Sequence, residues 1–127
     1  MCMFIAIIIA DDQAKSELRV ERFDALEIMP RFEYGEMTQV VETCGSRDGS
    51  ELGTGWGRFI DARIPWTVRY DEVLTVFEGE LRVYADGAVP PFAAQDSIWL
   101  PRGTELVYEA RSALVHCAIH PSSRYEG

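Results

Sequence analysis

Short β-rich segments recur along most of the chain, and glycine- or proline-containing turns separate them. Each segment is rich in Val, Leu, Phe, Tyr and Thr, and a spacing of about 8–12 residues is typical of antiparallel sheets. No stretch of about ten residues carries the 3.6-residue apolar period of an amphipathic helix. The pattern therefore predicts an all-β fold, an antiparallel β-sandwich or barrel. The expected strands cover 37–43, 58–62, 66–70, 73–77, 80–84, 97–100, 106–109 and 113–119.

The length of 127 residues predicts one barrel domain preceded by an N-terminal arm. We expect the arm over 1–30 and the barrel over 31–127, because the strand signal begins near residue 31. The arm opens with the apolar segment Met1–Ala10, which is too short for a membrane span of about 20 residues. It also lacks the basic start of a secretory signal. We expect it to form a strand at a sheet edge, with dimer contacts as a second option.

The chain is acidic, with 12 Lys+Arg against 21 Asp+Glu and a net charge of −9. Such a surface repels phosphate backbones and anionic lipids, so we expect neither nucleic acid nor membrane as a partner. The three cysteines, Cys2, Cys44 and Cys117, lie far apart without Cys-x-x-Cys spacing. An odd number of cysteines argues against a disulfide framework and predicts a cytoplasmic protein. A single disulfide between two of the three is the open alternative.

Two spaced motifs indicate which barrel this is. Glu72 is followed after six residues by Gly79, and the turn Pro101-Arg102-Gly103 follows the expected strand at 97–100. This pair resembles the two motifs of the cupin superfamily, in which glycines and a proline make tight turns between paired strands. One cupin family resembles the chain more specifically, the ethanolamine-utilisation protein Q family. The runs that carry this resemblance are Pro65-Trp66-Thr67, Tyr70-Asp71-Glu72 and Glu78-Gly79-Glu80-Leu81.

The resemblance implies an RmlC-like cupin fold, a small antiparallel β-barrel or jelly roll, over about residues 53–121. It also implies a connection with ethanolamine catabolism and, for some members, acetate kinase activity. Full-length members of that family carry an additional N-terminal region, whereas this chain has only about 50 residues before the match. By family habit we expect a homodimer.

The metal-binding histidines of most cupins have no counterpart here. The residues at these three motif positions are Trp66 and Val68 (or Pro65 and Thr67 with the alternative spacing) and Leu106. A transition metal prefers imidazole or thiolate ligands, and one carboxylate does not make such a site. We therefore expect no cofactor, with a divalent metal held by Glu72 and His116 as the weaker alternative.

Strand alternation predicts an aromatic pocket around Glu72, because alternate side chains of a small barrel face its interior. We expect Trp66, Tyr70 and Tyr108 to bind a small polar metabolite there. Burial raises the pKa of a carboxylic acid, so Glu72 is a candidate general acid or base. The plainer alternatives are a structural carboxylate and core tyrosines whose hydroxyls are hydrogen-bonded.

Two further residues are candidates for the site. If its face of the last strand is interior, His116 approaches Glu72 and forms an acid/base pair. Arg58 suits an anionic group of the ligand, although a surface charge is its plainer interpretation. Three functions follow: a small-molecule enzyme that uses Glu72, a non-catalytic ligand-sensing or dimerisation module, and a metalloenzyme with a site formed by Glu72 and His116.

Overall fold

The structure, a computed structural model, describes residues 18–30 and 34–123. The strand expected at Met1–Ala10 lies outside the described residues. Strands are the main elements of the described chain, and the short 3-10 helices η1 and η3 accompany them. The elements are η1 (Phe23–Ala25), β1 (Met29–Pro30), β2 (Thr38–Cys44), η3 (Ser46–Asp48), β3 (Gly53–Thr67), β4 (Asp71–Ala85), β5 (Gly87–Ala88), β6 (Phe92–Ala93), β7 (Ser97–Leu100) and β8 (Glu105–His120).

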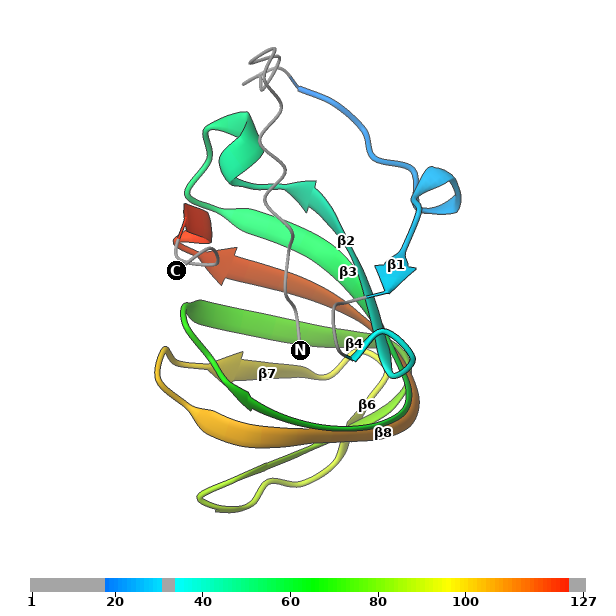
Figure 1. The fold of residues 1–127 in the computed structure, drawn as a ribbon, viewed down its shortest axis with the longest axis vertical. Coiled ribbons are helices and arrows are strands. Elements are labelled where there is room, and N and C mark those ends of the chain that lie inside the picture. Colours follow the sequence, from blue (N-terminus) through cyan, green and yellow to red (C-terminus); the bar gives the residue numbers. More distant parts are fainter. Residues whose placement is uncertain (1–17, 31–33, 124–127) are drawn as a thin grey trace.

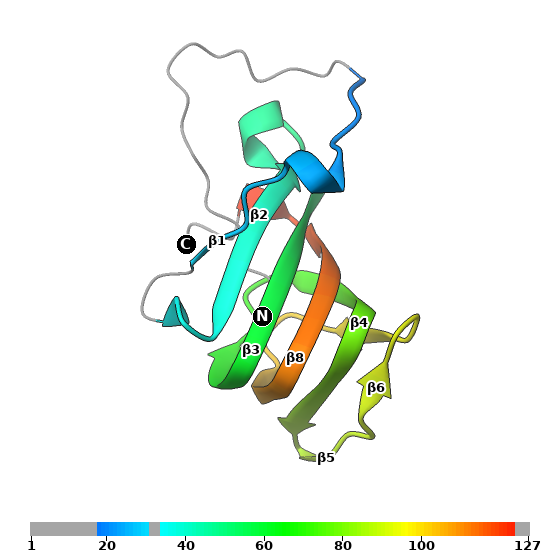
Figure 2. The ribbon, with the colours of Figure 1, turned by 90° about the vertical axis from the view of Figure 1, so that its right-hand side faces the viewer.

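All strand pairs are antiparallel, and the sheet order is β1-β2-β3-β8-β4-β5. The two short strands β6 and β7 pair with β4. Figure 2 shows β1, β2, β3, β8 and β4 side by side in this order. The all-β prediction is therefore confirmed, with β8 central between the long strands β3 and β4.

Three of the expected strand boundaries are wrong. The segments expected at 73–77 and 80–84 are one strand, β4, and those at 106–109 and 113–119 are one strand, β8. β4 and β8 pair with each other before and after a bend. The interruption of the apolar pattern therefore marks a change in the direction of the strand and not a loop. The segments expected at 58–62 and 66–70 also belong to one strand, β3, which begins at Gly53 and stops at Thr67.

The bend of β4 depends on Gly79. The long strands curve around at the right of Figure 1, which closes the sheet over a common interior. Gly79 has a φ of 83°, and a Cβ at this position would lie 2.0 Å from the carbonyl oxygen of Ser112 on β8. Two backbones approach this closely only where one residue has no side chain. The motif glycine at this position is thus required by the closure of the barrel.

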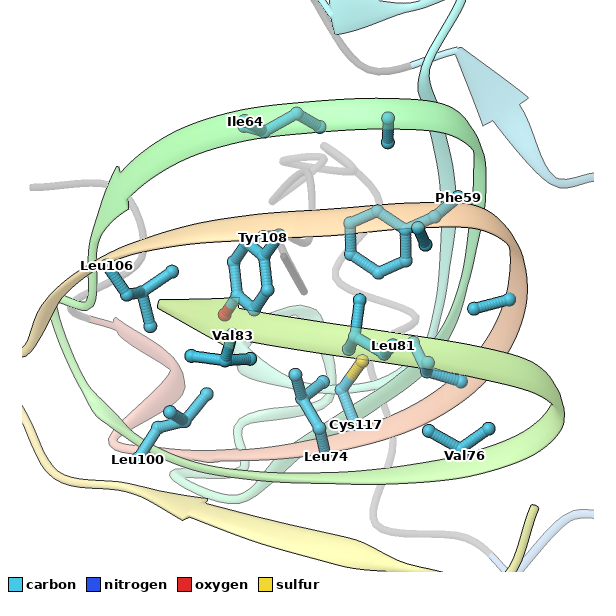
Figure 3. Packing of buried hydrophobic residues seen from close by; sticks show 14 of the residues in the cluster. Phe59, Ile64, Leu74, Val76, Leu81, Val83, Leu100, Leu106, Tyr108 and Cys117 are labelled. Carbon is cyan, nitrogen blue, oxygen red and sulfur yellow. The ribbon is translucent and has the colours of Figure 1, made fainter. Parts of the chain in front are cut away.

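The core fills the space between the walls of the barrel. Side chains alternate between inward and outward along β4 and β8, as the period of a strand requires. Figure 3 shows aliphatic side chains from facing strands meeting beneath the rings of Phe59 and Tyr108. The core residues are Phe59, Ala62, Ile64, Val68, Tyr70, Leu74, Val76, Leu81, Val83, Phe92, Leu100, Leu106, Tyr108, Ala110, Ala113, Val115, Cys117 and Ile119.

The described part of the arm is fastened to the outside of the barrel at three points. β1 pairs with β2, which makes the end of the arm part of the sheet. The ring of Phe23 meets that of Trp56 on β3 at 4.9 Å between centroids. The guanidinium of Arg19 donates to both carboxylate oxygens of Asp48, at 2.8 and 3.0 Å. No helix among the described residues is long and apolar enough to cross a membrane.

Candidate functional site

Glu72 lies inside the barrel near the start of β4. It stands between Ile119 on β8 and Leu100 on β7 in the strand register. Its side chain is only 1% exposed and shares the inward face of β4 with Leu74 and Val76. A carboxyl group this deeply buried is rare in a protein of ordinary composition, because desolvation of its ionised form is costly.

Two tyrosines share this interior. Tyr70 is 1% exposed and Tyr108 is fully buried. Burial raises the pKa of Tyr108 well above the ordinary value, and the nearby charges of Glu72 and Tyr70 raise it further. Tyr108 is therefore a neutral phenol that can donate one hydrogen bond. Among the described residues its hydroxyl has no hydrogen-bond partner, and Figure 3 shows it pointing into the interior.

An open cleft of about 380 Å³ lies at the end of the barrel nearest these tyrosines. Trp66 and Leu106, which are paired across β3 and β8, form part of its wall. The next inward-facing pair along the same two strands is Ile64 and Tyr108. The Trp66 and Leu106 side chains thus lie one layer outside the Tyr108 phenol, between it and the cleft. Tyr34 also lines this cleft, and no sequence motif indicated it.

The chemistry of this interior is that of a carboxyl group and phenols in apolar surroundings. The rings of Tyr108 and Phe59 lie 5.5 Å apart, and aliphatic core residues surround them. Such groups bind polar atoms of a small molecule and transfer protons. Within 18–30 and 34–123 no three His, Cys, Asp or Glu side chains cluster as a metal site requires.

Two predicted site residues lie on the opposite face of the sheet. His116 points outward, because its neighbour Cys117 occupies the inward position on β8. Its ring is 4.9 Å from that of Trp56, and partial burial lowers the pKa of the imidazole. Arg58 points outward for the same reason, since Phe59 faces the core. The expected approach of His116 to Glu72 is therefore wrong, and Arg58 does not reach the interior.

A larger cleft of about 680 Å³ lies outside the barrel, between the arm and strands β2, β3 and β8. Its cationic group, Arg19, is already engaged by Asp48, by Glu21 at 2.6 Å and by the carbonyl oxygen of Thr43. These ion pairs fasten the arm to the barrel. The barrel interior, with its buried carboxyl group and its phenols, is the stronger candidate for chemistry.

Known proteins resemble this chain in sequence and in fold. The family model of ethanolamine utilisation protein EutQ matches residues 9–118. The acetate kinase EutQ of Salmonella typhimurium is 29% identical over 93 residues, which cover 73% of this chain and 38% of that protein. The acetate kinase EutQ of Escherichia coli is 34% identical over 67 residues, which cover 53% of this chain and 29% of that protein. The chain thus spans less than two fifths of these relatives.

Solved structures share the fold. A putative ethanolamine utilization protein Q from Salmonella typhimurium superposes with a TM-score of 0.77 at 21% identity, over 91% of this chain and 92% of that chain. An RmlC-like cupin from Shewanella frigidimarina has a TM-score of 0.67 at 20% identity, over 86% of this chain and 95% of that chain. The antiparallel barrel is therefore a cupin barrel. Because the family model matches most of its length, the chain belongs to the EutQ family of ethanolamine utilisation proteins.

Proposed function

We propose that the barrel interior binds a small polar metabolite beside Glu72, with the Tyr108 phenol as a hydrogen-bond donor to the ligand. The observation that carries this proposal is that the buried Tyr108 hydroxyl has no hydrogen-bond partner within the described part of the chain. A buried donor without an acceptor costs about 1–3 kcal/mol. A ligand oxygen or nitrogen at this position removes that cost, which favours the bound state.

Glu72 is the proposed general acid or base if the ligand is turned over. Its carboxyl group lies close enough to Tyr108 to raise the pKa of the phenol. The chemistry then needs no metal, since one carboxyl group and one phenol suffice for proton transfer. Trp66 and Tyr70 complete the proposed contacts, Trp66 at the wall of the cleft and Tyr70 in the interior.

The relatives named acetate kinase suggest which compounds to test first. Acyl phosphates, small amines and aldehydes form the panel of test compounds. This chain spans only 38% and 29% of those two relatives. Activity of the whole relatives is thus a hypothesis for this chain. Thermal unfolding in the presence of each compound detects binding, since a ligand at 100 times its dissociation constant adds about 2.7 kcal/mol to the free energy of unfolding.

Mass spectrometry of the bound compound separates an enzyme from a binding module. Turnover by the wild type that Glu72→Gln abolishes without lowering the melting temperature supports an enzyme. A ligand that raises the melting temperature but is recovered unchanged supports the ligand-sensing alternative. If no compound of the panel stabilises the wild type more than Tyr108→Phe, the proposed site in the interior is contradicted.

A further inference from the structure

Two buried hydrogen-bond donors lie at the same end of the barrel interior. The indole nitrogen Nε1 of Trp66 is buried and, like the hydroxyl of Tyr108, has no hydrogen-bond partner within the described part of the chain. An indole N–H can only donate, and a phenol whose pKa is raised keeps its proton and can donate as well. A buried donor without an acceptor raises the free energy of the folded protein, so two of them at one place point to an acceptor from outside the chain.

The strand register brings these two donors within reach of each other. Trp66 pairs with Leu106 across β3 and β8, and Tyr108 follows two residues further along β8 on the same face. Diagonal neighbours of this kind lie about 7–8 Å apart, a distance that aromatic side chains can bridge. Trp66 packs against the core cluster to which Tyr108 belongs. One small molecule can therefore meet the indole N–H and the phenol hydroxyl together.

Charged groups of a ligand are disfavoured at this position. In the described part of the chain the buried polar or charged residues are Thr38, Glu72 and Ser122, so no buried lysine or arginine is among them. A ligand carboxylate would lose its hydration without meeting a cation, and it would face the carboxyl group of Glu72. Arg69 lines the cleft at the end of the barrel, but it is exposed to solvent. A ligand ammonium group has no lone pair with which to accept from Trp66.

We propose that Trp66 and Tyr108 together bind the oxygen of an uncharged carbonyl compound, such as a small amide or ketone. This inference rests on the proposed ligand site in the barrel interior and names the class of ligand. A carbonyl oxygen has two lone pairs, so it accepts one hydrogen bond from each donor. The other atoms of the ligand occupy the cleft of about 380 Å³, whose wall includes Trp66 and Leu106. The oxygen reaches Tyr108 when the Leu106 side chain changes its rotamer, as side chains at binding sites commonly do.

Proton–nitrogen correlation NMR of the full chain tests the class of ligand, because each tryptophan gives one indole N–H signal. The chain has three tryptophans, and the signal that Trp66→Phe removes belongs to Trp66. Propanamide and butanone are the uncharged probes, and propanoate and propylamine are charged probes of similar size. The uncharged probes are expected to move the Trp66 signal downfield in a saturable manner. The charged probes at the same concentrations are expected to leave it in place.

Calorimetric titration of variants tests the two donors separately. Trp66→Phe and Tyr108→Phe each remove one donor and keep an aromatic ring, and each is expected to weaken propanamide binding about 3–10-fold. Trp99→Phe is the matched control, because Trp99 is 59% exposed and does not line the cleft. This control is expected to bind propanamide as the wild type does. Circular dichroism confirms that each variant is folded.

Failure of this inference and failure of the proposed site give different results. If a charged probe binds, Tyr108→Phe weakens that binding and the uncharged probes do not bind, the site stands but the carbonyl class is overturned. If propanamide binds Trp66→Phe as tightly as the wild type, the joint action of the two donors is overturned. If no probe binds in a way that depends on Tyr108, both the carbonyl class and the proposed site are contradicted.

Discussion

Replacing Tyr108 with phenylalanine is expected to stabilise the ligand-free protein and to weaken ligand binding. The change removes one buried hydroxyl and keeps the ring that packs against Phe59. Because this hydroxyl has no hydrogen-bond partner among the described residues, its removal relieves part of a desolvation cost of about 1–3 kcal/mol. We expect a gain of about 1 kcal/mol in the free energy of unfolding, because the remaining ring leaves a gap where the oxygen was. At this chain length the gain corresponds to a melting temperature higher by about 3–5 °C.

Urea unfolding followed by circular dichroism measures this difference without any ligand. Tyr84→Phe is the matched control, since Tyr84 is 37% exposed and its hydroxyl donates to Oε1 of Glu109 at 3.1 Å. That control is expected to lose up to about 1 kcal/mol, the net value of a typical hydrogen bond. If Tyr108→Phe instead loses more than about 1 kcal/mol, its hydroxyl is satisfied within the folded protein, and the argument for a ligand at this position is refuted.

Three further predictions concern stability. Gly79→Ala is expected to lower the free energy of unfolding by at least about 3 kcal/mol in chemical unfolding, because the new Cβ meets the Ser112 carbonyl oxygen and the residue must keep a positive φ. An effect below about 1 kcal/mol would contradict this close approach of the two backbones. The pKa of His116 is lowered in the folded state, so protonation of its imidazole opposes folding. The free energy of unfolding should therefore fall as the pH drops through the ordinary histidine pKa of 6.5. His116→Gln should flatten that part of the pH profile. Asp48→Asn is expected to lose about 0.5–1 kcal/mol in the free energy of unfolding, because it weakens the contacts with Arg19. The pKa of Asp48 is lowered in the folded state, so this contribution is present above the ordinary carboxyl pKa of 3.8 and disappears in more acidic solution. Equal losses at about pH 7 and about pH 2.5 would count against it.

Strand content followed from the local pattern, and so did the residues that share one face of a strand. A period of two predicted that Glu72, Leu74 and Val76 share one face of their strand, and their burial in the structure shows that this face is the inward one. His116 and Arg58 were misplaced because an alternating strand has two faces, and parity does not say which one is covered. The core on one side of β8 and solvent on the other decided that Cys117 faces inward and His116 outward.

The continuity of the long strands was not predictable from the same pattern. At Gly79 the apolar alternation stops, and a stop of this kind is common to loops and to bends within a strand. Only the pairing of β4 with β8 on both sides of the bend distinguishes the two cases.

The sequence by itself determined the class of fold, the turn at 101–103 and the shared strand face of Glu72, Leu74 and Val76, because these depend on neighbours within a few residues. Tertiary structure decided which tyrosine hydroxyl has no hydrogen-bond partner among the described residues, and which side of the last strand is outside. Those properties depend on contacts between strands, and a strand pattern of period two is the same whichever partner the strand finds.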